Sequence, residues 1–276
     1  MLNVLLAVLT LAALGLVLGG LIGFTARKFA VRVDPRIEEI TNLLPGANCG
    51  GCGYAGCADY ARAIVEGGAS PAGCVAVSEE NFQKISAAVG QETGKRERKV
   101  AVVYCSGDNG HAVHVAMYNG LNDCRAAASL SGAGKGCRFG CIGLGSCARN
   151  CPFGAIEVRN GLAVVHPEIC TGCGKCTEIC PRKLIRLVSA GSQAHVYCNS
   201  LDKGPAKRKN CSAGCLACRK CVKAAPEIFN AQGFLVRARE GAEIPEELIA
   251  SIKCPTGALH SVETHLARGK GKEGAA

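Results

Sequence analysis

The chain has 276 residues, enough for one to three domains, but it contains only seven Phe, five Tyr and no Trp. Large aromatic cores are therefore not expected, and the 20 Cys and 36 Gly indicate small modules organised by bound metal. The net charge of +10 counts every Cys as neutral, whereas a four-iron cluster held by four thiolates carries about 2−. About five such clusters would offset this charge, which argues against a nucleic-acid-binding protein.

The spacing of the cysteines indicates their chemistry. They occur in runs two or three residues apart, unlike the scattered cysteines of secreted, disulfide-bonded proteins. Such runs suit iron-sulfur or zinc ligation, and they favour a reducing cytosol.

The N-terminal segment is predicted to cross a membrane. Residues 2–26 carry no charge, and at about 1.5 Å per residue this helix exceeds the roughly 30 Å hydrocarbon core. A cleaved signal peptide is the alternative, but a basic n-region is absent and the apolar run is too long. Arg27, Lys28 and Arg32 follow the span, which predicts that the bulk of the chain is cytoplasmic. One helix face carries small residues, which either admit another transmembrane helix or merely reflect a Gly-rich span: Gly15, Gly19 and Gly23.

After the span, the sequence predicts a small helical module around four cysteines. Asp34 and Pro35 are typical of a helix N-cap and first turn, and this helix ends before Pro45. Further helices are expected over residues 58–66 and 78–89. The spacing of the cysteines differs from that of a zinc ribbon and predicts one four-iron cluster. Its ligands are Cys49, Cys52, Cys57 and Cys74.

The strongest motif in the chain is a bacterial ferredoxin run that ends before Pro181. A looser companion, with enlarged gaps, ends before Pro152. In two-cluster ferredoxins the Cys that precedes Pro ligates the other cluster. The sequence therefore predicts one cluster on Cys137, Cys141, Cys147 and Cys180. It predicts another on Cys151, Cys170, Cys173 and Cys176.

Between these runs, Asn160-Gly161 separates two β-rich segments, residues 155–158 and 163–165, and predicts a hairpin. The Gly-rich loop over residues 138–146 is longer than a ferredoxin normally has, which leaves the geometry of its cluster open.

A second ferredoxin-like unit follows, in which Ala225-Pro226 stands where a two-cluster ferredoxin would place its next Cys. This unit is predicted to hold one cluster on Cys215, Cys218, Cys221 and Cys254. Four cysteines remain, and they either form a further cluster across the first ferredoxin unit or are free thiols: Cys105, Cys124, Cys198 and Cys211. The prediction is thus three to five four-iron clusters.

Other motifs carry no catalytic prediction. Residues 132–136 lack the Ser or Thr of a phosphate loop, and no dinucleotide-binding fingerprint is present, so no nicotinamide or flavin site is expected. The six His are interpreted as solvated surface residues. Two basic runs are either simply solvated or attract acidic partners or lipid headgroups. They consist of Lys207, Arg208 and Lys209, and of Arg268, Lys270 and Lys272 in the tail.

The order of these motifs resembles the B subunit family of the Rnf ion-translocating electron transport complexes. The first cysteine module is also similar to a small domain of corrinoid iron-sulfur proteins, and the Gly-rich expansion and the four remaining cysteines have counterparts in Rnf B subunits. The resemblance implies a complex that oxidises reduced ferredoxin, reduces NAD at flavin and nicotinamide sites on other subunits, and pumps Na⁺ or H⁺. This chain would be the electron entry port, a single-pass protein of the bacterial inner membrane without a complete active site. A different membrane-tethered polyferredoxin and a zinc-stabilised interaction scaffold are the alternatives.

The expected fold class is α+β, with a transmembrane helix, a small helical iron-sulfur domain and ferredoxin-like units of hairpins and helices. The expected boundaries, in chain order, are 1–26 for the span, 27–45 for a juxtamembrane helix, 46–95 for the small iron-sulfur domain, 96–135 for a connecting β-containing segment, 136–190 for the two-cluster unit, 191–265 for the single-cluster unit and 266–276 for a disordered tail.

Overall fold

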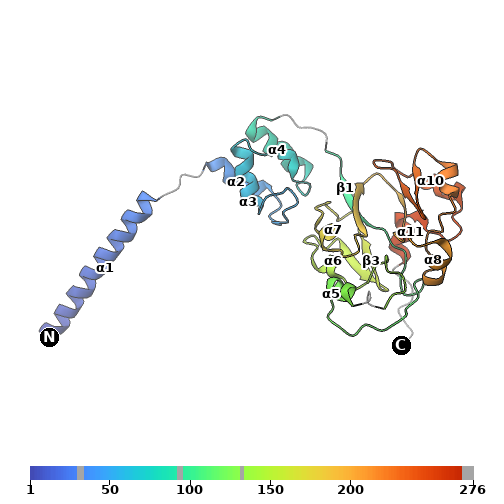
Figure 1. Cartoon of the computed structure of the whole chain (residues 1–276). Helices are drawn as coiled ribbons and strands as arrows, with labels where there is room; N and C mark the ends of the chain where they lie inside the picture. Colours follow the sequence, from blue (N-terminus) through green and yellow to red (C-terminus); the bar gives the residue numbers. More distant parts are fainter. Residues whose placement is uncertain (30–33, 92–95, 131–133, 269–276) are drawn as a thin grey trace.

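The computed structural model describes residues 1–29, 34–91, 96–130 and 134–268 (Figure 1). Arg32, Lys270 and Lys272, on which the sequence predictions drew, lie outside these described residues. The chain begins with helices alone and continues with small two-stranded sheets and short helices, which confirms the predicted α+β class.

Helix α1 (Leu2–Lys28) is long and apolar enough to cross a membrane, with a mean hydropathy of 2.6 over its most apolar window. Arg27 and Lys28 occupy its last turn, where positive charge complements the helix dipole. An added Cβ on any of the three predicted small-residue positions, Gly15, Gly19 and Gly23, would meet nothing within 4 Å. This face is therefore uncovered within the described part of the chain.

The small helical domain follows, built from α2 (Pro35–Leu43), α3 (Cys57–Val65), the short 3₁₀ helix η1 (Pro71–Gly73) and α4 (Glu79–Val89). The predicted N-cap of α2 is confirmed, and the structure shows a second cap at the start of α4. The carboxylate of Asp34 accepts from the N–H of Arg36 at 2.9 Å, and the hydroxyl of Ser78 accepts from the N–H of Asn81 at 3.3 Å. The helices pack on the fully buried side chains Ile40, Tyr60, Ile64, Phe82 and Ile85.

The first ferredoxin unit nests one strand pair inside another. β1 (Lys99–Val103) pairs antiparallel with β4 (Ile185–Ser189), and between them in sequence lies the hairpin of β2 (Ile156–Arg159) and β3 (Leu162–Val165). Asn160 and Gly161 have φ of 45° and 70°, as the predicted two-residue hairpin turn requires. The short helices of this unit are α5 (Cys124–Ser129), α6 (Ser146–Arg149) and α7 (Lys175–Ile179). Strand β1, which lies in the segment predicted to connect two domains, thus completes the outer strand pair of this unit.

The second unit repeats the nested order. β5 (Ala194–Val196) pairs with β8 (Leu259–Ser261), and the hairpin of β6 (Phe229–Gln232) and β7 (Leu235–Ala238) lies between them in sequence. Its helices are α8 (Gly204–Asn210), α9 (Lys220–Ala224), α10 (Glu246–Ile252) and α11 (Val262–Arg268). Helix α11 includes residues 266–268, so the predicted disorder is wrong for these three residues.

Candidate iron-sulfur centres

The Cys49 quartet (Cys49, Cys52, Cys57 and Cys74) lines one cavity in the small domain. Side-chain hydrogen bonds fix the backbone at two of these cysteines, Cys57 and Cys74. The side-chain carbonyl of Asn48 accepts from the N–H of Cys57 at 2.8 Å, where α3 begins. On the other side, the Tyr60 hydroxyl accepts from the N–H of Cys74 at 3.0 Å and donates to Ser70 O at 2.6 Å. The sequence predicted that these four cysteines bind one cluster, and in the structure they surround one cavity.

The Cys170 quartet (Cys151, Cys170, Cys173 and Cys176) also gathers as predicted. Burial, and then the nearby thiols of the other three, raise the pKa of Cys176 to about 12. The N–H of Ala101 in β1 donates to the sulfur of Cys170 at 3.3 Å. Such N–H groups aimed at cluster sulfurs are one means by which a protein sets reduction potential.

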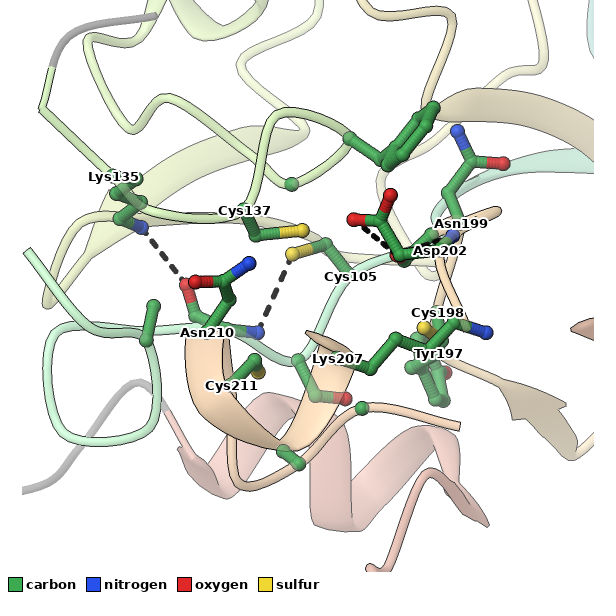
Figure 2. A pocket seen from close by; sticks show the side chains of 18 residues that line it. Cys105, Lys135, Cys137, Tyr197, Cys198, Asn199, Asp202, Lys207, Asn210 and Cys211 are labelled. Carbon is green, nitrogen blue, oxygen red and sulfur yellow. Dashed lines mark hydrogen bonds between the residues drawn. The ribbon is translucent and has the colours of Figure 1, made fainter. Parts of the chain in front are cut away.

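The other two predicted groupings need a correction. One cavity is lined by the Cys147 quartet, which contains Cys124, Cys141, Cys147 and Cys180. Another is lined by the Cys105 quartet, which contains Cys105, Cys137, Cys198 and Cys211 (Figure 2). The sequence-based grouping is thus wrong at two positions, since Cys124 and Cys137 have exchanged places.

The exchange has a local cause at Cys137. An isolated β-bridge pairs Ala112 with Cys211, and a second pairs His114 with Lys135. Between them, Val113 accepts from the N–H of Gly136 at 2.8 Å and donates to Asn210 O at 3.0 Å. These contacts bring the chain just before Cys137 alongside Cys211.

The place that Cys137 leaves is taken by Cys124 at the start of α5. Its N–H donates to the hydroxyl of Ser146 at 2.8 Å, and that hydroxyl donates to Asp123 at 2.9 Å. Ser146 directly precedes Cys147, so this network sets Cys124 beside Cys147. Burial, and then the neighbouring thiols, raise the pKa of Cys147 to about 12.

The Cys218 quartet (Cys215, Cys218, Cys221 and Cys254) gathers in the second ferredoxin unit. Burial, and then the thiols of Cys215 and Cys218, raise the pKa of Cys221 to about 11. Cys254 packs against the same apolar core as Cys215 and Cys221.

These quartets fit iron-sulfur clusters chemically. No three His, Cys, Asp or Glu side chains in the described residues converge on one point as a mononuclear site requires, but a cubane binds each thiolate at a different iron. Three of the quartets line a shared cavity, and in the other two the thiols influence one another or pack on one apolar core. Because burial raises these thiol pKa values, the positive iron core is what would stabilise the thiolate forms.

The five quartets form one row, in which each quartet neighbours the next. The thiol of Cys49 neighbours that of Cys173, and Cys147 neighbours Cys176. The N–H of Cys141 donates to the sulfur of Cys105 at 3.3 Å. At the far end, the backbone of Cys215 hydrogen-bonds the sulfur of Cys198. In spatial order, the row is the Cys49, Cys170, Cys147, Cys105 and Cys218 quartets.

Two buried lysines accompany this row. The ammonium of Lys135, 5 % exposed, donates to Gly107 O at 2.8 Å and Gly161 O at 2.7 Å. Lys207, 2 % exposed, donates to Cys215 O at 3.0 Å and to Phe234 O. Both line the cavity of the Cys105 quartet. The prediction that the run around Lys207 is a solvated surface is therefore wrong for Lys207 itself.

The prediction that all His are solvated is also wrong for three of them. His195, His260 and His265 are buried, and Tyr197 stacks on His265 with ring centroids 3.8 Å apart. The pairing of β5 with β8 sets His195 opposite His260. His195 and His260 lie singly on three-residue strands and His265 lies on α11, so no periodicity in the sequence indicated their burial.

The comparisons with known proteins agree with this geometry. The family described as "Putative Fe-S cluster" matches residues 44–76, and the family described as "4Fe-4S dicluster domain" matches residues 140–184. The B subunit of an ion-translocating oxidoreductase complex from Methanosarcina acetivorans is 39% identical, over 80% of this chain and 84% of that protein.

Two further relatives are B subunits of ferredoxin:NAD(+) oxidoreductase complexes. The Na(+)-translocating one of Acetobacterium woodii is 42% identical, over 74% of this chain and 62% of that protein. The proton-translocating one of Clostridium ljungdahlii is 36% identical, over 94% of this chain and 93% of that protein. The similarity therefore extends over nearly the whole chain.

Proposed function

Because this chain belongs to the family of B subunits of ion-translocating oxidoreductase complexes, we propose that it carries single electrons from reduced ferredoxin, along its five cysteine quartets, to other subunits of such a complex. It is an electron-transfer subunit of an oxidoreductase that reduces NAD at sites on other subunits. The names of its relatives include both Na(+)-translocating and proton-translocating complexes.

The observation that carries this proposal is the single row of quartets. When bound, four-iron clusters supply reversible one-electron chemistry. The chain contributes the thiolates, the short spacing between successive quartets and the exclusion of water, with most of the cysteines buried or half-buried. Backbone N–H groups reach the sulfurs of Cys105 and Cys170 from neighbouring loops and strands. This arrangement suits electron relay and provides no acid-base machinery.

The protein is a membrane-associated subunit. We propose that α1 is its single span in the bacterial inner membrane, and that all the quartets are cytoplasmic. Support comes from the length and hydropathy of α1 and from the basic residues Arg27 and Lys28 at its end. Reduced cysteines throughout the chain fit the same compartment.

The experiment is a metal and reduction analysis of the full chain, purified anaerobically in detergent. We expect about 20 iron and about 20 sulfide per chain, with EPR signals from the reduced state and rapid bleaching of visible absorbance by reduced ferredoxin. About 16 iron would mean that one quartet remains as thiols. Zinc in place of iron, or no reduction by ferredoxin, would contradict the electron-relay function.

A further inference from the structure

One end of the row of quartets is open to solvent. All twenty cysteines lie in the described part of the chain, and among them Cys218 alone is exposed. Exposed basic side chains flank this quartet in sequence: Arg219, Lys220, Lys223 and Lys253. Glu227 is the nearest exposed acidic residue in sequence. The sequence immediately around Cys218 therefore carries more exposed positive than negative charge, while Glu246 and Glu247 lie further away in sequence, on α10.

The internal repeat gives this end a counterpart within the same chain. The loop Cys170–Cys176 and the loop Cys215–Cys221 share the same cysteine spacing, and each leads into a short helix, α7 or α9. Cys218 is the equivalent of Cys173, the middle cysteine of its loop. We call the part of each loop around this middle cysteine its tip. The group that contacts the tip at Cys173 thus indicates the kind of partner that would contact the tip at Cys218.

The tip at Cys173 is covered by another cluster loop. A Cβ added to Gly51 would lie only 2.8 Å from the carbonyl oxygen of Cys173, so the loop of the Cys49 quartet packs directly on it. The thiol of Cys49 lies close enough to influence that of Cys173 electrostatically. The first unit therefore shows an iron-sulfur protein loop seated on this kind of tip.

The two loops differ in the residues that adopt a left-handed backbone conformation. Gly172 and Gly174, with φ of 74° and 80°, flank Cys173, whereas Ala217 and Arg219, with φ of 55° and 61°, flank Cys218. A non-glycine residue in this left-handed region costs about 1 kcal/mol or more. Arg219 thus occupies a position where glycine would be favoured for the fold, directly beside the exposed ligand. Backbone strain of this kind clusters at functional sites.

We infer that the exposed Cys218 tip, with Arg219, Lys220, Lys223 and Lys253, is the docking surface for a small acidic one-electron carrier protein. This inference rests on the proposed function and specifies where the donor binds. On docking, one electron leaves the reduced carrier, which becomes oxidised, and enters the group held by the Cys218 quartet, which becomes reduced. No covalent bond forms or breaks, and no proton is required.

The test measures binding as well as reduction, using the full chain in lipid nanodiscs and an oxidised acidic ferredoxin as the probe. The variant is Arg219→Gly with Lys220→Gln. We expect its Kd to rise about tenfold at low salt, because opposite charges at the rim drive the encounter. The dependence of Kd on salt should become shallower, because fewer charge pairs remain to be screened. Reduction by an uncharged small reductant should change much less than reduction by ferredoxin, because it does not depend on docking.

Two controls separate charge from fold. Ala217→Gly relieves the same kind of backbone strain without removing charge, so its Kd should equal that of wild type. Arg208→Gln with Lys209→Gln removes two exposed charges from α8, the basic run identified in the sequence, and should change Kd less than twofold. Arg219→Gly should melt no lower than wild type, because glycine suits its backbone.

The outcomes are distinct. If wild type binds ferredoxin and the Arg219 variant binds equally, or if only the α8 variant loses affinity, the docking surface assigned here is wrong while the relay function stands. If wild type neither binds ferredoxin nor is reduced by it, the proposed function itself fails. Carbodiimide cross-links from ferredoxin carboxylates to Lys220 or Lys223 would support the assignment in unmodified protein, and cross-links confined to Lys209 would contradict it.

Discussion

The backbone N–H of Cys141 donates to the sulfur of Cys105 at 3.3 Å, and so joins two quartets that draw on different parts of the chain. The N–H of Gly107 donates to the same sulfur, also at 3.3 Å. The sulfur of Cys105 is therefore hydrogen-bonded by the main chain of the neighbouring Cys147 quartet. This contact places the two cavities side by side. A substitution in one quartet should therefore alter the structure around the other.

The membership of these two quartets can be tested by paired alanine substitutions. Cys105→Ala with Cys137→Ala removes two ligands from one quartet and should lower the iron content by about four atoms. Cys105→Ala with Cys124→Ala removes one ligand from each of two quartets and should lower it by about eight. Elemental analysis and EPR on anaerobic protein provide the count. The opposite pattern would restore the grouping predicted from sequence.

Lys135 should raise the reduction potential of the Cys105 quartet, because a buried ammonium beside an acceptor stabilises the added electron. We expect Lys135→Met to lower that potential by on the order of 50 mV. EPR-monitored redox titration measures the change. Lys209→Met, an exposed residue on α8, is the matched control and should leave the potential unaltered. A shift toward higher potential in the Lys135 variant would show that its charge does not act on this quartet.

Gly51 should control the contact between the small domain and the first ferredoxin unit. In Gly51→Ala the new Cβ would lie 2.8 Å from Cys173 O, so the loops must separate at a cost of about 1–3 kcal/mol. Electron transfer into the Cys49 quartet should slow, and amide exchange in the Cys173 loop should rise. Stopped-flow reduction and hydrogen exchange measure the two effects. Gly68→Ala is the control, since its Cβ would make only ordinary contact, 3.6 Å from Ala63 O. Equal rates in both variants would contradict this role.

The buried His cluster should make the fold sensitive to acid. Burial lowers the pKa of His195 and His260 to about 4 and also lowers that of His265. Since the unfolded pKa is about 6.5, the unfolded state binds more protons between these values. Stability is therefore complete above about pH 6.5 and falls toward pH 4, by about 1.4 kcal/mol per pH unit for each His.

His195→Phe isolates one of these groups. The Nε2 of His195 has no hydrogen-bond partner in the described structure, and the ring packs edge-on against Tyr197, so a phenyl ring suits the site. Thermal unfolding of both proteins between pH 7.5 and pH 4.5 should show a shallower decline in the variant. Acid loss of iron is common to both and cancels in the comparison. Parallel declines would mean that His195 does not titrate on unfolding.

Local signals in the sequence predicted the local structure well. Asp34-Pro35 begins a helix and Asn160-Gly161 forms a hairpin turn, because caps and tight turns depend on a few adjacent residues. The gathering of the Cys170 quartet follows from its ferredoxin spacing. In each case, the residues that determine the structure are close together in the chain or belong to one short repeat.

The exchange of Cys124 and Cys137 could not be predicted in this way. It depends on the bridge between Ala112 and Cys211 and on the contact of Cys124 with Ser146, both of which join distant segments. The enlarged loop over residues 138–146 was the only signal of this exchange in the sequence, since it separates Cys137 from the other cysteines of its run. Burial of Lys207 likewise depends on Cys215 O and Phe234 O, which belong to other segments.

The Cys105 quartet takes its cysteines from both ferredoxin units, since Cys105 and Cys137 precede β4 while Cys198 and Cys211 follow β5. During synthesis this site is incomplete until the ribosome has passed Cys211, after the ligands of the Cys49, Cys170 and Cys147 quartets have all emerged. Metal bound there would act as a cross-link between the units, because its binding free energy would add to their association. Oxygen that destroyed a cluster at this site would therefore both interrupt the relay and weaken the association of the two ferredoxin units.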